Sequence, residues 1–113
     1  MVSMEIVRKA LGKKGVEIVL KNNEGSLGSV IASSQDGVVK VGYLGVKPKY
    51  RRSGYGSLLM SEVERWTGEK GAKEIRVNIN PVPGSEGGVF KILKRHEFKI
   101  KGNTGSKKIK GKG

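Results

Sequence analysis

The sequence predicts a mixed α/β (α+β) domain in which an antiparallel meander leads into a strand–helix–strand crossover. Residues 16–46 contain three apolar, β-branched runs, and turn signals separate them at residues 22–25 and 35–37. Residues 58–66 instead carry apolar side chains at helical spacing, and residues 74–80 return to the alternation of a strand. We therefore expect a single sheet with a helix packed against it.

The expected strands of the meander cover residues 16–21, 27–33 and 38–46, with a further strand at residues 5–11. Gly25 lies in a turn where a positive φ is expected. Strict alternation in the third strand predicts one shared face for Val39, Val41, Tyr43 and Gly45. Pro48 ends this strand because proline has no N–H to donate to a neighbour.

The helix after the meander has an apolar stripe made by Leu59, Val63 and Trp66. Gly68 and Gly71 are typical signals for its end. A strand over residues 74–80 follows, then a short helix over residues 88–95 and a last short strand near Phe98 and Ile100. Residues 1–100 are expected to form the single domain, and the basic residues 101–113 a mobile tail.

The composition narrows the classes of function. The chain has no cysteine, which excludes disulfides and thiolate metal sites and favours a reducing, cytoplasmic compartment. Its single histidine, His96, excludes a multi-histidine metal site, and no apolar run approaches the roughly 20 residues of a membrane span. The net charge of +13 favours phosphate ligands, nucleic acid or an acidic protein surface. A solvated lysine surface explains the same charge equally well.

Residues 44–59 carry the clearest chemical signal. They predict a strand end, a basic glycine-containing loop and a helix start. The first N–H groups of a helix have no intrahelical acceptor, and the helix dipole adds positive charge there. Gly54 and Gly56 allow a bulky anion to approach the backbone, and Arg51 and Arg52 add formal charge. This pattern predicts a phosphate or pyrophosphate site, and no Gly-Lys-Ser/Thr of a Walker loop is present.

The run Leu44-x-Val46-x-Pro48-x-Tyr50-Arg51-x-x-Gly54-x-Gly56-x-x-Leu59 resembles motif A of the GNAT superfamily of N-acetyltransferases. The resemblance extends over roughly residues 15–100 and includes Glu97-Phe98, where the family commonly has Gly-Phe. It implies a twisted mixed sheet with acetyl-coenzyme A in a V-shaped cleft between two strands, and transfer of the acetyl group to an amine.

The resemblance also implies which residues bind coenzyme A. Backbone groups of the strand end are expected to pair with the pantetheine arm, and those of the loop and helix start to hold the pyrophosphate. The expected residues are Leu44, Gly45, Val46, Arg51, Arg52, Ser53, Gly54, Tyr55, Gly56 and Ser57.

The sequence departs from the family at the positions that handle protons. The strand over residues 38–46 has no Asp or Glu to act as a base, and Leu93 stands where a tyrosine commonly acts as the acid. Tyr43 is the remaining candidate acid, although core packing is the role expected first for it. His96 is expected to be a surface histidine, since it follows the basic pair Lys94-Arg95.

The short segment before the second strand leaves the function open at this point. Only about 15 residues precede the second strand, so the helices that often shape the acceptor pocket are absent. The acceptor side is then expected to be open, which suits a protein or peptide amine, or to be completed by a second copy or another partner. The alternatives to an active acetyltransferase are an acetyl-coenzyme A-binding module without turnover and a basic nucleic-acid-associated protein.

Overall fold

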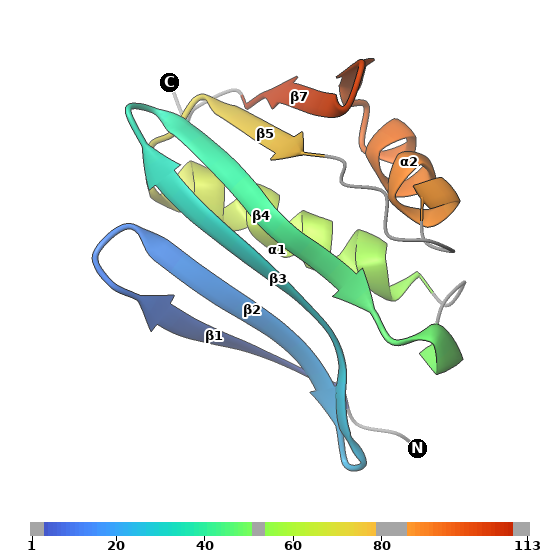
Figure 1. Ribbon diagram of the computed structural model, residues 1–113. Helices are drawn as coiled ribbons and strands as arrows, with labels where there is room; N and C mark the ends of the chain where they lie inside the picture. Colours follow the sequence, from blue (N-terminus) through green and yellow to red (C-terminus); the bar gives the residue numbers. More distant parts are fainter. Residues whose placement is uncertain (1–3, 51–53, 79–85, 110–113) are drawn as a thin grey trace.

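The computed structural model describes residues 4–50, 54–78 and 86–109. Its centre is a seven-stranded sheet with the order β1-β2-β3-β4-β5-β7-β6 (Figure 1). The strands are β1 (Glu5–Leu11), β2 (Gly15–Asn22), β3 (Gly25–Gln35), β4 (Val38–Val46), β5 (Glu74–Asn78), β6 (Lys99–Lys101) and β7 (Thr104–Lys108). The helical elements are the 3₁₀ turn η1 (Pro48–Tyr50), α1 (Tyr55–Glu69) and α2 (Glu86–Arg95).

The predicted meander is confirmed, and its turns use the residues that tight turns require. β1 to β4 pair antiparallel in chain order. Asp36 and Gly37, with φ angles of 52° and 78°, form a two-residue connection between β3 and β4 of the kind favoured in hairpins. Gly25 has the expected positive φ, 128°. β1 joins β2 through residues 12–14 alone, so no helix stands between the first two strands.

The strand–helix–strand crossover is also confirmed. β4 and β5 pair in parallel, and α1 joins them and packs on one face of the sheet, behind it in Figure 1. The stripe of Leu59, Val63 and Trp66 is buried there. Gly71, with a φ of 71°, follows the end of the helix as predicted. The core between helix and sheet includes Ile18, Leu20, Leu27, Val30, Val39 and Ile75.

The end of the chain differs from the expectation of a mobile tail after residue 100. Residues 104–108 form β7, which lies between β5 and β6 and pairs antiparallel with both. Polar and glycine residues suffice here because backbone hydrogen bonds, not apolar side chains, connect the strand. Gly105 also leaves room for Leu93, whose Cδ1 lies 2.9 Å from where a Cβ would stand. Residues 110–113 lie outside the described part.

The predicted alternation of β4 fails halfway along the strand. Ile31 pairs with Tyr43 and Ala32 pairs with Val41, so Gly42 is an extra residue in β4, a β-bulge. The bulge reverses the direction of the following side chains relative to strict alternation. Val39 and Val41 are buried against α1, whereas 53% of Tyr43 is exposed. Core packing, the role expected first for Tyr43, is therefore wrong.

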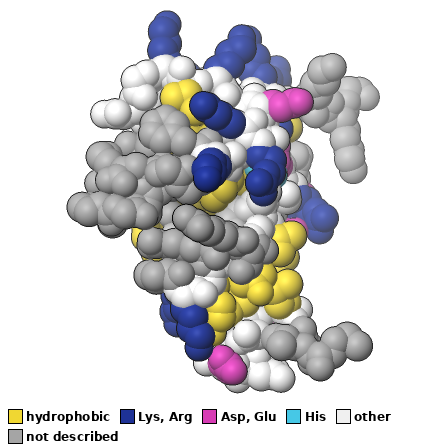
Figure 2. Space-filling view, turned by 90° about the vertical axis from the view of Figure 1, so that its right-hand side faces the viewer, with side chains coloured by type: hydrophobic (Ala, Val, Ile, Leu, Met, Phe, Trp, Pro, Cys, Tyr) yellow, Lys and Arg dark blue, Asp and Glu magenta, His cyan; other side chains and the backbone are white. Residues whose placement is uncertain are grey.

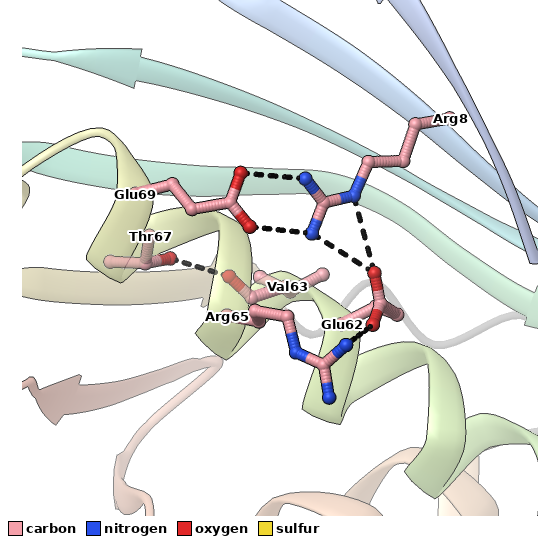
Figure 3. Close-up of polar contacts among 6 residues, drawn as sticks. All are labelled: Arg8, Glu62, Val63, Arg65, Thr67 and Glu69. Carbon is pink, nitrogen blue, oxygen red and sulfur yellow. Dashed lines mark hydrogen bonds and ion pairs between the residues drawn. The ribbon is translucent and has the colours of Figure 1, made fainter.

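An ion-pair network ties the edge strand β1 to α1 (Figure 3). Arg8 donates from Nη1 and Nη2 to the two carboxylate oxygens of Glu69, at 2.7 and 3.0 Å. Its Nε and Nη2 also donate to Oε2 of the buried Glu62, at 3.2 and 3.0 Å. Arg65 contacts the other oxygen of Glu62 at 3.1 Å. Glu62 is thus buried with both oxygens paired, as a buried carboxylate requires.

Candidate active site

β4 and β5 run together for only part of their length. Their parallel register covers Val38 to Val41 of β4 and Glu74 to Val77 of β5. β4 continues to Val46, whereas Asn78 is the last residue of β5. The bulge at Gly42 lies just beyond the last pair of this register. Within the described residues, the register of β4 with β5 therefore stops at the bulge, and the segment from Gly42 to Val46 is the candidate edge for a ligand.

This segment of β4 is held from its other side by β3. Gly28 lies so close to β4 that a Cβ on it would stand 2.7 Å from the Gly45 carbonyl oxygen and 3.1 Å from Val46 Cα. The Lys47 N–H also donates to the Leu27 carbonyl at 2.9 Å. Glycine at position 28 thus permits a close approach of the two strands directly behind the candidate edge.

The start of α1 supplies the second part of the site. Gly54 precedes the helix with a left-handed φ of 80°, a conformation that favours glycine. The helical hydrogen bonds begin when Leu58 N–H donates to the Gly54 carbonyl. The N–H groups of Tyr55, Gly56 and Ser57 therefore belong to the first turn, where helices bind anions.

Gly56 has a packing role in addition to the predicted approach to an anion. A Cβ on this residue would collide with Cδ1 of Ile92 on α2. The first turn of α1 therefore lies against α2, and the second glycine of the motif permits that contact. Arg51, Arg52 and Ser53, the remaining predicted loop residues, lie outside the described residues.

The turn between β2 and β3 reaches the same end of the molecule. Glu24 lies in this turn, and Tyr50 Oη donates a hydrogen bond of 3.3 Å to its carboxylate. The ring of Tyr50 lies 6.3 Å from that of Tyr55, centroid to centroid. Tyr50 and Tyr55 thus pack together at the start of α1.

The two positions considered for a proton donor, Leu93 and Tyr43, lie in different surroundings. Leu93 is fully buried in the core. Tyr43 is exposed beside the bulge, and its ring lies over Gly45, where a Cβ would collide with its hydroxyl. Among the residues that the structure describes, no group of three His, Asp or Glu side chains could hold a metal ion.

His96 is not the surface residue that the sequence predicts. It lies between two residues of α1, with Nε2 2.7 Å from Ser57 Oγ and Nδ1 2.8 Å from Glu64 Oε1. Only 11% of its side chain is exposed. The basic residues before His96 predict a side chain exposed to solvent. The turn after α2 instead directs the imidazole back toward α1. Its pairing with Glu64 across 32 positions has no local sequence signal.

Figure 2 views the side of the molecule where α2 and the start of α1 lie, and Lys and Arg prevail among the charged side chains drawn there. Exposed cations on this end include Lys47, Lys49, Lys91, Lys94 and Arg95. Such a field favours a polyanionic ligand and accelerates its encounter with the site. No helix in the described part of the chain is long and apolar enough to cross a membrane.

Comparisons with solved structures agree with this arrangement. The crystal structure of the ribosomal-protein-S18-alanine N-acetyltransferase from Escherichia coli has a TM-score of 0.78 and 12% identity, and the alignment covers 100% of this chain and 97% of that one. The PaiA N-acetyltransferase from Thermoplasma acidophilum, in complex with coenzyme A, has a TM-score of 0.71 and 20% identity over 84% of this chain and 61% of that one. These similarities show a shared fold.

Comparisons of sequence identify the family. A curated relative, "Probable N-acetyltransferase 14" from Danio rerio, is 30% identical over 99 residues, which are 85% of this chain and 34% of the relative. This chain thus spans about a third of that protein. The model of the acetyltransferase (GNAT) family matches residues 5–82, more than half of the chain. On this match and on the fold, the chain belongs to the GNAT acetyltransferase family, whose members use acetyl-coenzyme A.

Proposed function

We propose that this chain transfers an acetyl group from acetyl-coenzyme A to the amine of a protein or peptide. The observation that carries the proposal is the end of the described β4–β5 register at the Gly42 bulge, together with the first turn of α1 after β4. The family match supports the reaction class. The acceptor class is argued from the shape of the molecule around the bulge.

The residues present fit the cofactor. Acetyl-coenzyme A supplies the acyl carbon as a thioester and carries phosphates that need positive partners. N–H groups of Gly54, Tyr55, Gly56 and Ser57 would hold the pyrophosphate at the dipole of α1, and Arg51 and Arg52 of the same motif would add charge. Leu44, Gly45 and Val46 would pair with the pantetheine arm as an added strand does. Gly28 supports this fit, because it positions β4 at that segment.

The sheet face opposite α1, the near face in Figure 1, is the surface open to an acceptor. No helix of the described part of the chain covers that face. The direct turn between β1 and β2 adds no element over it. The exposed Tyr43 and Ile31 lie on it as a cross-strand pair. A small amine would find little to enclose it there, whereas an extended peptide could lie across the strands. A protein or peptide amine therefore suits this face best.

Tyr43 is the group that we propose for the proton transfer. Breaking the thioester releases a thiolate, and a phenol can protonate it. Tyr43 is exposed directly after the Gly42 bulge, and the packing of its ring over Gly45 orients the hydroxyl along β4. Leu93 at the family's usual acid position leaves this role open for Tyr43.

The test measures acetylation of a peptide library and of a panel of small amines and polyamines, with acetyl-coenzyme A as donor. The proposal expects turnover on peptides and a fall in kcat of at least about tenfold in Tyr43→Phe, because one general acid typically contributes 10²–10⁴-fold. Ile31→Ala, which alters the neighbouring side chain on the same face, should raise the KM for peptides but retain kcat, which separates peptide binding from proton transfer. Turnover confined to small amines would contradict the acceptor class. Calorimetric binding without any turnover would favour the alternative of a binding module.

A further inference from the structure

Ser57, His96 and Glu64 form a relay of three side chains between α1 and the turn after α2. Ser57 Oγ lies 2.7 Å from His96 Nε2, and His96 Nδ1 lies 2.8 Å from Glu64 Oε1. Ser57 and Glu64 are seven residues apart on α1, which places them two turns apart on one side of the helix. The imidazole therefore bridges the two turns from the neighbouring element.

The chemistry of the three groups assigns the protons in the neutral relay. A carboxylate can only accept hydrogen bonds, so Nδ1 of the imidazole carries the proton that it shares with Glu64. Nε2 is then an acceptor, and the Ser57 hydroxyl donates to it. A hydroxyl, a base and a carboxylate that orients the base are the arrangement that activates serine nucleophiles on unrelated folds.

The surroundings support this arrangement. Only 11% of the His96 side chain and 21% of the Glu64 side chain are exposed, so bulk water competes little with their hydrogen bond. Lys107 of β7 donates to the second oxygen of Glu64, which leaves Oε1 on the imidazole. Ser57 is the third residue of α1, and its side chain tilts toward the helix start. The first-turn N–H groups there can stabilise a developing oxyanion.

We propose that Ser57 is an activated nucleophile and that it gives the chain a second activity, the cleavage of small activated acyl esters. Ser57 Oγ would bond to the acyl carbon while its proton moves to His96 Nε2. The bond between the acyl carbon and the ester oxygen then breaks, and the departing alcohol takes that proton. Water next attacks the acyl-serine through the same imidazole, which releases the carboxylic acid and restores the Ser57 hydroxyl.

The test is labelling by a fluorophosphonate probe, which modifies activated serines. It is done on the full chain without coenzyme A, because Ser57 belongs to the segment proposed to bind the cofactor. Trypsin releases residues 53–65 as one peptide, which contains Ser53, Ser57 and Ser61. Fragmentation of this peptide then locates the label, with the exposed Ser61 of the same helix as an internal reference.

The expected result is a label on Ser57 that Ser57→Ala abolishes and Ser61→Ala leaves unchanged. His96→Gln and Glu64→Gln should slow labelling at least about tenfold, since a positioned base typically contributes 10²–10⁴-fold. Thermal melts of each variant establish that it is folded at the labelling temperature. The hydrolysis of p-nitrophenyl acetate should be slowed most by Ser57→Ala, less by His96→Gln and Glu64→Gln, and not by Ser61→Ala. Absence of label from Ser57 in the folded parent chain would overturn the proposal, as would labelling at an equal rate in folded His96→Gln.

Discussion

Replacement of Gly28 by alanine tests how closely β3 and β4 approach behind the candidate site. The added Cβ would stand 2.7 Å from the Gly45 carbonyl oxygen and 3.1 Å from Val46 Cα, and both are backbone atoms that no rotamer change can move. Such overpacking typically costs about 1–3 kcal/mol. The lower entropy of the unfolded alanine chain offsets about 0.4–1 kcal/mol of that. A net loss of about 1–2 kcal/mol is expected, or a Tm lower by roughly 4–8 °C for a domain of this size.

Gly42→Ala is the matched control, since it makes the same change in the next strand. In the described part of the chain, apart from its immediate neighbours, no heavy atom lies within 4 Å of where its Cβ would stand. This variant should keep its Tm or gain slightly. Thermal melts followed by circular dichroism measure both variants, and calorimetry measures the affinity of Gly28→Ala for acetyl-coenzyme A, which should fall. A Gly28→Ala variant as stable as Gly42→Ala would refute the close approach.

Two further predictions concern the network of Figure 3. Arg8→Met keeps most of the apolar stem but leaves the buried Glu62 with Arg65 as its remaining partner among the described residues. Thermal melts should therefore show a loss of about 2 kcal/mol, and an unchanged Tm would contradict a structural role for the contact. The two hydrogen bonds from Arg8 lower the pKa of the Glu69 carboxyl below its ordinary value of 4.5. The resulting stability is present above pH 4.5 and is lost as pH falls through the lowered pKa, so Glu69→Gln should reduce the difference in Tm between pH 7 and pH 3. An undiminished difference would argue against this linkage.

Most of the fold could be predicted because its signals are local. The turn glycines, the alternation of β2 and the stripe of Leu59, Val63 and Trp66 each indicate one element without knowledge of the rest. β7 could not be predicted in this way. Its polar residues carry no apolar pattern, and its place in the sheet depends on hydrogen bonds to β5. The paired residues Arg76 and Ser106, for example, are 30 positions apart in the sequence.

In the candidate site, too, the features with a local signal could be predicted, and those that depend on tertiary packing could not. The residues of motif A could be identified from spacing, and Gly54 has the left-handed conformation that a helix start at Tyr55 uses. The bulge at Gly42 could not, since one extra residue leaves the composition of the strand unchanged while it turns Tyr43 toward solvent. The position of His96 also depends on tertiary packing, because its partners Ser57 and Glu64 are 39 and 32 residues away.

We propose that acetyl-coenzyme A lies between the first turn of α1 and the segment of β4 beyond the bulge. Backbone amide shifts measured by NMR during a titration with acetyl-coenzyme A test this position. The largest changes are expected on Tyr55, Gly56 and Ser57 and on residues 42–46. Changes confined to β1 and β2, or no change at millimolar cofactor, would contradict it.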